Sequence, residues 1–458
     1  MQKLIRGVIF AGVSDCNSSL FFQGANLVNL FDLQKIIWLQ RSGSKTFSGF
    51  FIVQVVVFCQ LATTMQEIGS IKKIIFFIFA IFISVQSLFS SPITERVQIS
   101  LLTCGAGEEM YSAYGHSAIR ILDKDQGFDI IYNYGVFDFN TPNFYLKFAQ
   151  GKLLYYLAIE NTENFIDAYK YEGRSVFEQV LNLDSLQLTT LIFLLDENYQ
   201  PENRAYLYDF FYDNCSTRIR EIVQKAMGNT FKWDLREGEQ KYTFRQCIKT
   251  FHKGHSWGDF GIDLCLGLPC DKIADKYNQM FLPNVLSESF QNASFIVANS
   301  EKKPFVKVAQ WINPPQQLFT AEHWFTPIIM NSLIALFLLS IIFIKNTSIQ
   351  LSADILLFGI TGLLGLLFLL LWFATDHKAT VWNFNLLWAL PNNLAALFYL
   401  KNNSKGKIYF LFVAFLNSLL LVFGWLLPQD LNLAVYPIIL VLAVRSFIIY
   451  KRKTLIKT

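Results

Sequence analysis

Long apolar runs dominate the C-terminal third of the chain and predict helices that cross a membrane. Five such runs follow one another, each bounded by charged or turn residues: Trp324–Ile344, Ile355–Phe373, Phe384–Leu400, Ile408–Leu427 and Leu433–Ile449. Each has close to the roughly 17 to 25 residues with which a helix spans a bilayer. We therefore predict an all-α bundle of five transmembrane helices over residues 323–458, rather than a set of buried core helices.

Basic residues are distributed unevenly between the connections of these helices. Eight lysines and arginines collect on one side: Lys345, Lys401, Lys405, Lys407, Lys451, Arg452, Lys453 and Lys457. On the other side lie only Lys378, with Asp376 and His377, and Asp430. Because basic loops stay in the cytoplasm, the C-terminus is predicted to be cytoplasmic, and everything before Trp324 external.

An external domain needs an export signal, and the sequence contains one. Lys72 and Lys73 precede the apolar stretch Ile74–Phe89, which small residues follow. This order is typical of a signal peptide or signal anchor, which we place at residues 65–91. Residues 1–64 lack a clear periodicity and are interpreted as an upstream extension, with the natural start at Met65.

The segment between the signal and the membrane runs, residues 92–322, has the size of an ordinary domain. Three stretches have strand-like composition: Val97–Thr103, Ser117–Leu122 and Ile130–Phe137. Three others have helical periodicity: Asn143–Gln150, Ser185–Asn198 and Cys215–Met227. The mixture predicts an α+β fold with a small antiparallel sheet.

Composition excludes several classes of protein. Apolar residues make up 53% of the chain and charged residues 16%, against about 25% charged residues in soluble domains. With 45 Phe and 19 Tyr the chain is not a disordered one. The net charge of +4 is too small for nucleic-acid binding, and eight of the basic residues gather in connections on one side of the predicted transmembrane helices. Seven Cys are too few for a disulfide scaffold.

Cys215 is the first candidate for chemistry. It follows Asp213 and Asn214, either of which is a natural N-cap, so Cys215 falls in the first turn of the helix that they start. There the helix dipole favours an anion and lowers the pKa of a thiol, which makes a nucleophile. The alternative interpretation is a small buried cysteine on the packing face of the helix.

His116 is the candidate base. It stands at the mouth of the strand-like run that begins at Ser117, where an imidazole can face the start of a helix. Only five His occur in the chain; His252 and His255 fit a surface turn. A structural hydrogen-bonding role for His116 is the alternative. A third polar group should orient the base, and Asn133 and Tyr134 on the next strand are the candidates.

Metal and cofactor motifs are not found in the sequence. There is no C-x-x-C pair, Gly-rich phosphate loop, nucleophile elbow or HExxH, so no cofactor or metal is predicted. Cys265 and Cys270 are close enough in sequence for a local disulfide in an exported domain, and Cys104 and Cys247 are a further possible pair.

Four segments give the chain a family resemblance: LLTCG at 101–105, GHSAIRI at 115–121, NYGVFDF at 133–139 and YDNCSTRIR at 212–220. They resemble the Lnb N-terminal periplasmic domain family, named after a bacterial lipoprotein N-acyltransferase. The tail, with TVWNFNLLWALP at 380–391, is similar to that of membrane-bound members. The order of His and Cys also resembles the circularly permuted NlpC/P60 papain-like fold.

The resemblance implies a nucleophile at Cys215 and a base at His116, in the periplasmic domain of a bacterial inner-membrane protein. It implies acyl transfer through a Cys thioester, from a membrane lipid or lipoprotein ester to an amine of the lipoprotein N-terminus. Two alternatives stay open at this point. One is a cell-wall amidase or peptidase of the NlpC/P60 type with the same Cys and His; the other is a non-catalytic envelope membrane protein.

Overall fold

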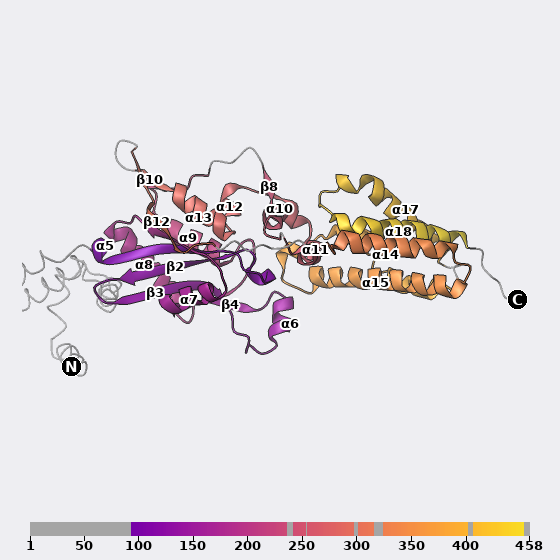
Figure 1. Cartoon of the computed structure of the whole chain (residues 1–458), viewed down its shortest axis with the longest axis horizontal. Coiled ribbons are helices and arrows are strands. Elements are labelled where there is room, and N and C mark those ends of the chain that lie inside the picture. The colour runs from indigo at the N-terminus through magenta and orange to yellow at the C-terminus, as the bar shows by residue number, and fades with distance from the viewer. Residues whose placement is uncertain are drawn as a thin grey trace, which may run out of the picture. The chain divides into compact units, whose positions relative to one another are not determined.

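A computed structural model describes residues 93–235, 241–252, 254–296, 301–315, 324–401 and 406–452. The predicted extension, 1–64, and the predicted export signal, 65–91, lie outside these described residues. The described part contains an α+β domain followed by a helical domain (Figure 1). It confirms the coarse fold class predicted from the sequence.

A seven-stranded sheet forms the centre of the α+β domain. Its order is β12-β5-β1-β2-β3-β4-β6, and every neighbouring pair is antiparallel. The strands are β1 (Val97–Cys104), β2 (His116–Asp123), β3 (Phe128–Val136), β4 (Leu154–Asn161), β5 (Val176–Leu181), β6 (Ala205–Leu207) and β12 (Val306–Asn313). The three predicted strands are β1, β2 and β3, next to one another in the middle of the sheet.

Helices cover both faces of the sheet, which explains why β1 is buried along most of its length. On one face, α7 (Thr162–Tyr171) packs Phe165 and Ile166 against Leu102, Ala118 and Ile131. On the other face lie α8 (Ser185–Tyr199), α9 (Cys215–Met227) and α13 (Pro283–Asn292). The hydroxyls of Ser216 in α9 and Ser117 in β2 are 3.0 Å apart and both buried. This contact fixes α9 on the strand that begins at His116.

Smaller elements complete the domain. Its short helices are α6 (Phe144–Ala149), α10 (Phe244–Lys249), α11 (Ser256–Cys265), α12 (Lys276–Gln279), η2 (Met110–Ser112) and η3 (Leu268–Asp271), and α5 (Ile93–Arg96) precedes β1 in the sequence. One small sheet joins β7 (Phe231–Lys232), β10 (Ser294–Ile296) and β11 (Lys302–Pro304), and another joins β8 (Tyr242–Thr243) and β9 (Ile273–Ala274).

The helical domain contains α14 (Pro327–Ser340), α15 (Thr347–Phe373), α17 (Lys407–Phe423) and α18 (Tyr436–Lys451), with η5 (Ile341–Phe343), η9 (Gly424–Leu426) and η10 (Leu433–Val435). Three helical stretches of the described chain are long and apolar enough to cross a membrane: Thr347–Phe373, Lys407–Leu426 and Leu433–Lys451. Pro327–Phe343 is a shorter apolar helix. The predicted count of five spans is therefore not confirmed.

The third predicted span, Phe384–Leu400, differs most from its prediction. It folds as η7 (Phe384–Leu387), α16 (Asn393–Ala396) and η8 (Leu397–Tyr399), after η6 (Lys378–Thr380). Pro391 lacks the N–H that a continuous helix needs. A β-carbon on Gly365 of α15 would lie 2.1 Å from the Ala389 oxygen, so glycine there lets the broken segment approach α15. The segment packs against α15, and this contact accommodates its irregular backbone.

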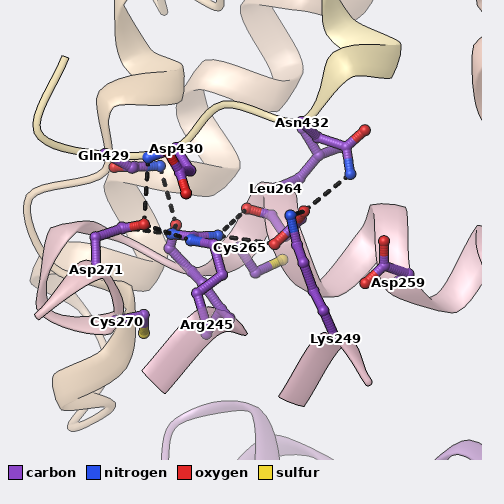
Figure 2. Close-up of polar contacts among 12 residues, drawn as sticks. Arg245, Lys249, Asp259, Leu264, Cys265, Cys270, Asp271, Gln429, Asp430 and Asn432 are labelled. Carbon is purple, nitrogen blue, oxygen red and sulfur yellow. Dashed lines mark hydrogen bonds and ion pairs between the residues drawn. The ribbon is translucent and has the colours of Figure 1, made fainter. Parts of the chain in front are cut away.

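A buried ion cluster connects the two domains (Figure 2). Arg245 of α10 donates to Asp271 Oδ1 at 2.8 Å and to Asp263 Oδ1 at 2.9 Å. From the loop between α17 and α18, the Asp430 backbone N–H donates to Asp271 and the Asn432 amide to Asp263. The α+β domain thus shares buried charges with a loop of the helical domain.

We predict that Arg245→Met destabilises the protein by about 3 to 5 kcal/mol, because it leaves the Asp271 carboxylate without its counter-ion and the buried Asp263 carboxylate with Lys249 alone. Thermal unfolding followed by tryptophan fluorescence in lipid nanodiscs measures the effect. Lys378→Met is the matched control, since Lys378 is exposed and lies 3.9 Å from Asp209; it should change stability by less than about 0.5 kcal/mol. Equal melting temperatures for the two variants would contradict the role of the cluster.

Candidate active site

The start of α9 is fixed by a capping box at Asn214. The Asn214 Oδ1 atom accepts from the Thr217 backbone N–H at 2.9 Å, and Thr217 Oγ1 accepts from the Asn214 N–H at 2.7 Å. The Asn214 amide also donates to the Phe210 and Phe281 carbonyls, so this buried side chain has all its partners. Of the two predicted caps, Asn214 fills the role, and Asp213 instead pairs with Arg218. Cys215 is consequently the first residue of the helix.

Cys215 lies beside His116, although the two residues are 99 positions apart. The thiol hydrogen-bonds to the His116 ring, to the Ser117 backbone N–H and to the Ser216 hydroxyl. Only 6% of Cys215 is exposed. The structure therefore brings together the two residues that the sequence singled out as nucleophile and base.

Asn133 and Glu160 extend this pair into a chain of four side chains. The His116 Nε2 atom lies 2.7 Å from Asn133 Oδ1, and Asn133 Nδ2 donates to Glu160 Oε1 at 2.7 Å. A carboxylate only accepts, so Glu160 turns the NH2 of Asn133 toward itself and the amide oxygen toward His116. His116 Nε2 must then carry the proton, which leaves Nδ1 free to accept from the thiol.

The electrostatics of the pair favour a thiolate. Burial raises the pKa of the Cys215 thiol, but the charge of the His116 ring and its hydrogen bond outweigh burial and hold that pKa below its ordinary value. Burial lowers the pKa of His116, while Cys215 and the hydrogen bond to Asn133 raise it above its ordinary value overall. The two groups therefore stabilise each other in their charged forms.

A β-bulge at Gly135 lies beside Cys215. Gly135 has φ +91, a conformation that favours glycine, and the pairing of β3 with β4 shifts register here. A β-carbon on Gly135 would lie 3.9 Å from Cys215 Cβ, 3.6 Å from the Tyr208 ring and 3.9 Å from the Tyr206 hydroxyl. Two tyrosines thus border the candidate nucleophile.

Tyr134, the other candidate for the third group, lies elsewhere. It is buried, and its hydroxyl accepts a hydrogen bond from Asn198 of α8 at 3.0 Å, on the sheet face opposite Asn133. Among the two candidates, only Asn133 joins the hydrogen bonds of His116.

Several residues of the site were not found from the sequence. Glu160 belongs to β4, which pairs with β3, and Tyr206 belongs to β6, which pairs with β4. No local pattern reveals the register of these pairs. His252, expected in a surface turn, is buried; its ring lies 2.7 Å from the Tyr114 hydroxyl and 2.6 Å from Asp259. The sequence signal for the burial of His252 was the apolar residue before it, Phe251.

The other cysteines of the described chain are free thiols: Cys104, Cys247, Cys265 and Cys270. The two candidate disulfides are not formed in this structure. Burial raises the pKa of Cys104 and of Cys270 to about 12, and that of Cys247 to about 11. Within the described residues, no three His, Cys, Asp or Glu side chains are grouped so that they could hold a metal ion.

Comparison with known families matches two segments of the chain. Residues 90–250 match the Lnb N-terminal periplasmic domain, and residues 319–454 match the Lnb transmembrane domain. The first match contains Cys215, His116, Asn133 and Glu160. No curated protein and no solved structure matches the chain.

We predict that iodoacetamide at pH 7 alkylates Cys215 faster than the four other described cysteines. Iodoacetamide reacts with the thiolate form of cysteine. Cys215 stays deprotonated at a lower pH than an ordinary cysteine, whose pKa is about 8.5. His116→Ala should move the pH profile of the reaction upward, because it removes the group that lowers the pKa. Peptide mass spectrometry measures the rate at each site. An unchanged profile in this variant would show that the imidazole does not activate the thiol.

Proposed function

Because the chain carries both Lnb domains and belongs to that family, we propose that it is a membrane-bound cysteine acyltransferase. It moves a fatty acyl chain from a lipid or lipoprotein ester, through a thioester on Cys215, to the N-terminal amine of a lipoprotein. The observation that carries this proposal is the hydrogen-bonded chain from Cys215 through His116 and Asn133 to Glu160, in a periplasmic domain that is part of a membrane protein.

In the first half of the reaction, Cys215 attacks the ester. His116 Nδ1 takes the thiol proton, and the sulfur forms a bond to the carbonyl carbon. The carbon–oxygen bond of the ester then breaks, and the leaving alkoxide takes the proton from His116. Asn133 holds the ring in the tautomer that this step needs, and Glu160 orients Asn133.

In the second half, the amine attacks the thioester. The carbon–sulfur bond breaks, the amide bond forms, and His116 accepts the proton that the amine nitrogen loses before returning it to the thiolate. A thiolate serves both halves, since it is a good attacking group and a good leaving group. The products are an N-acylated terminus and free enzyme.

We assign Tyr206 to the stabilisation of the oxyanion that forms in both halves of the reaction. Its hydroxyl is buried and has no hydrogen-bond partner within the described residues. The Arg218 guanidinium lies 3.7 Å from the centre of its ring, and its charge partly offsets the burial that raises the pKa of the hydroxyl. Together with the Cys215 backbone N–H at the start of α9, it supplies a second donor beside the sulfur.

The contacts between domains support the orientation inferred from the basic residues. Asp376 and Asp430 lie in the two connections predicted outside, and the backbone N–H of each donates to the periplasmic domain, at Gln150 and Asp271. We propose on this basis an inner-membrane protein with its C-terminus in the cytoplasm.

A groove next to Tyr208 favours a second candidate, the cell-wall amidase or peptidase. It has a volume of about 700 Å³ and charged lining residues, among them Asp209, Asp213, Arg218 and Lys225. A groove with mixed charges suits a peptide. The adduct trapped on Cys215 decides between the two: an acyl group supports the transferase, and a peptidyl group supports the amidase.

We predict that Cys215→Ala abolishes N-acylation of lipoproteins while the protein still folds. Mass spectrometry of lipoprotein N-termini, from cells that carry only the variant, measures the effect, and intact-protein mass spectrometry of the wild type should detect a thioester-linked acyl chain. Cys104→Ala, which removes a buried thiol of raised pKa, is the control and should retain N-acylation. N-acylation that persists in the Cys215 variant would remove this residue as the nucleophile.

We predict that Tyr206→Phe slows acylation of Cys215 by about 10 to 100 times, because the oxyanion loses one donor. KM should change little, since the donor acts on charge that develops in the transition state. Tyr134→Phe is the matched control: it removes a buried hydroxyl that is bonded to Asn198, and should leave the rate close to that of the wild type. Single-turnover kinetics with both variants measure this. Equal rates for the two would refute the assignment of Tyr206.

A further inference from the structure

The hairpin between β3 and β4 exposes an unusual number of apolar side chains. This segment, residues 137–154, contains α6 (Figure 1). Its exposed large apolar residues are Phe139, Tyr145, Leu146, Phe148 and Leu154, with Tyr145 80% and Phe139 69% exposed. A group of this size on a surface marks contact with a membrane or with a protein.

The hairpin is tied to the end of a transmembrane helix. The Asp376 backbone N–H donates to the Gln150 carbonyl at 2.8 Å, and the His377 ring donates to the Phe148 carbonyl at 3.3 Å. Gly151, with φ +70, allows this approach, because a β-carbon there would lie 3.2 Å from His377 Nδ1. These partners follow α15 by only a few residues.

The end of α15 marks the level of the membrane surface. Its 27 residues extend about 40 Å, enough to cross a hydrocarbon core of about 30 Å. Trp372 and Phe373 end the helix, and Trp382 packs on Trp372 with ring centres 4.8 Å apart. Phe373 and Trp382 are exposed. Aromatic residues of this kind gather where the bilayer meets water, so the hairpin lies at that level.

A row of aromatic rings leads from the hairpin to Cys215. Ring centres are 5.7 Å apart between Phe144 and Phe137, 5.3 Å between Phe137 and Tyr155, and 4.5 Å between Tyr155 and Tyr208. Tyr208 and Cys215 both border Gly135. The row is thus continuous from an exposed surface to the buried sulfur.

We propose that the hairpin inserts its apolar side chains into the periplasmic leaflet of the membrane, and that the aromatic row guides the acyl chain of an ester from this leaflet to Cys215. This inference rests on the proposed acyl transfer and identifies its donor as a lipid that stays in the bilayer. Rings of Phe and Tyr present apolar faces along the path, so the acyl chain of the ester need not enter water.

The bilayer, rather than a protein, is the occupant that the contacts favour. The exposed apolar side chains belong to a hairpin held at the end of α15, the level at which the aromatic residues mark the membrane surface. Lys147 and Lys152 accompany the apolar side chains, and basic residues beside aromatic ones are typical of segments that lie in the interface of anionic membranes.

Photocrosslinking in the full-length protein tests the surface. Benzoylphenylalanine replaces Tyr145 in one variant and Tyr171, which is 95% exposed at the end of α7, in the control. Both are placed in vesicles of phosphatidylethanolamine and phosphatidylglycerol. Phospholipid adducts should form at position 145 and not at 171. Protein adducts alone at position 145, or equal lipid adducts at both positions, would overturn the proposal.

A kinetic comparison tests the route. Acylation of Cys215 is measured with a phospholipid ester in vesicles and with a short water-soluble ester, and the ratio of the two rates is taken. The double variant Tyr145→Ser, Phe148→Ser should lower this ratio about tenfold, because insertion of the apolar groups is weakened. Leu186→Ser, a change at another exposed apolar residue, should leave it unchanged. An unaltered ratio in the double variant would refute the route.

The two tests separate this inference from the proposed function. If the wild type forms no thioester with either ester, the acyltransferase proposal fails, whereas the lipid adducts at position 145 still report on membrane contact. If the thioester forms but position 145 gives no lipid adduct, the acyltransferase stands and the hairpin proposal fails.

Discussion

Charge compensation between Cys215 and His116 is the constraint on which the rest of the site depends. A thiolate in a buried position is unfavourable without a cation against it, and an imidazolium is unfavourable there without an anion. Each group makes the other's charged form tolerable. The capping box at Asn214 fixes the start of α9, and the serine pair holds α9 on β2, so both position the sulfur beside the ring.

The hydrogen bonds of Asn133 and Glu160 orient the His116 ring toward Cys215. Glu160 fixes the amide of Asn133, Asn133 fixes the tautomer of the ring, and the ring then offers its remaining nitrogen to the sulfur. Such a chain resembles the arrangement in which a base is oriented by a third group. It joins β2, β3 and β4 to α9, so the sheet itself acts as the frame of the site.

Sequence reasoning succeeded where local pattern determines structure. The cap at Asn214 and the apolar periodicity after it placed α9 correctly, and strand-like composition placed β1, β2 and β3. Glu160 and Tyr206 were missed because their positions depend on strand register and on the bulge at Gly135. The span Phe384–Leu400 was wrong as a continuous helix because hydropathy describes side chains and not the regularity of the backbone. Pro391 and the glycines of α15 determine that backbone instead.

The contacts between the domains bear on which reaction the site performs. Asp263 and Asp271, the carboxylates that pair with Arg245, accept hydrogen bonds from the loop at 429–432, and the Gly267 N–H donates to the Ala379 carbonyl. A chain cut before Trp324 would lose these partners and leave polar groups of the α10 and α11 region incompletely paired. A soluble amidase gains nothing from such dependence on a membrane domain. An enzyme whose acyl donor lies in the bilayer benefits from it, because the same contacts hold its nucleophile at a constant height above the lipid.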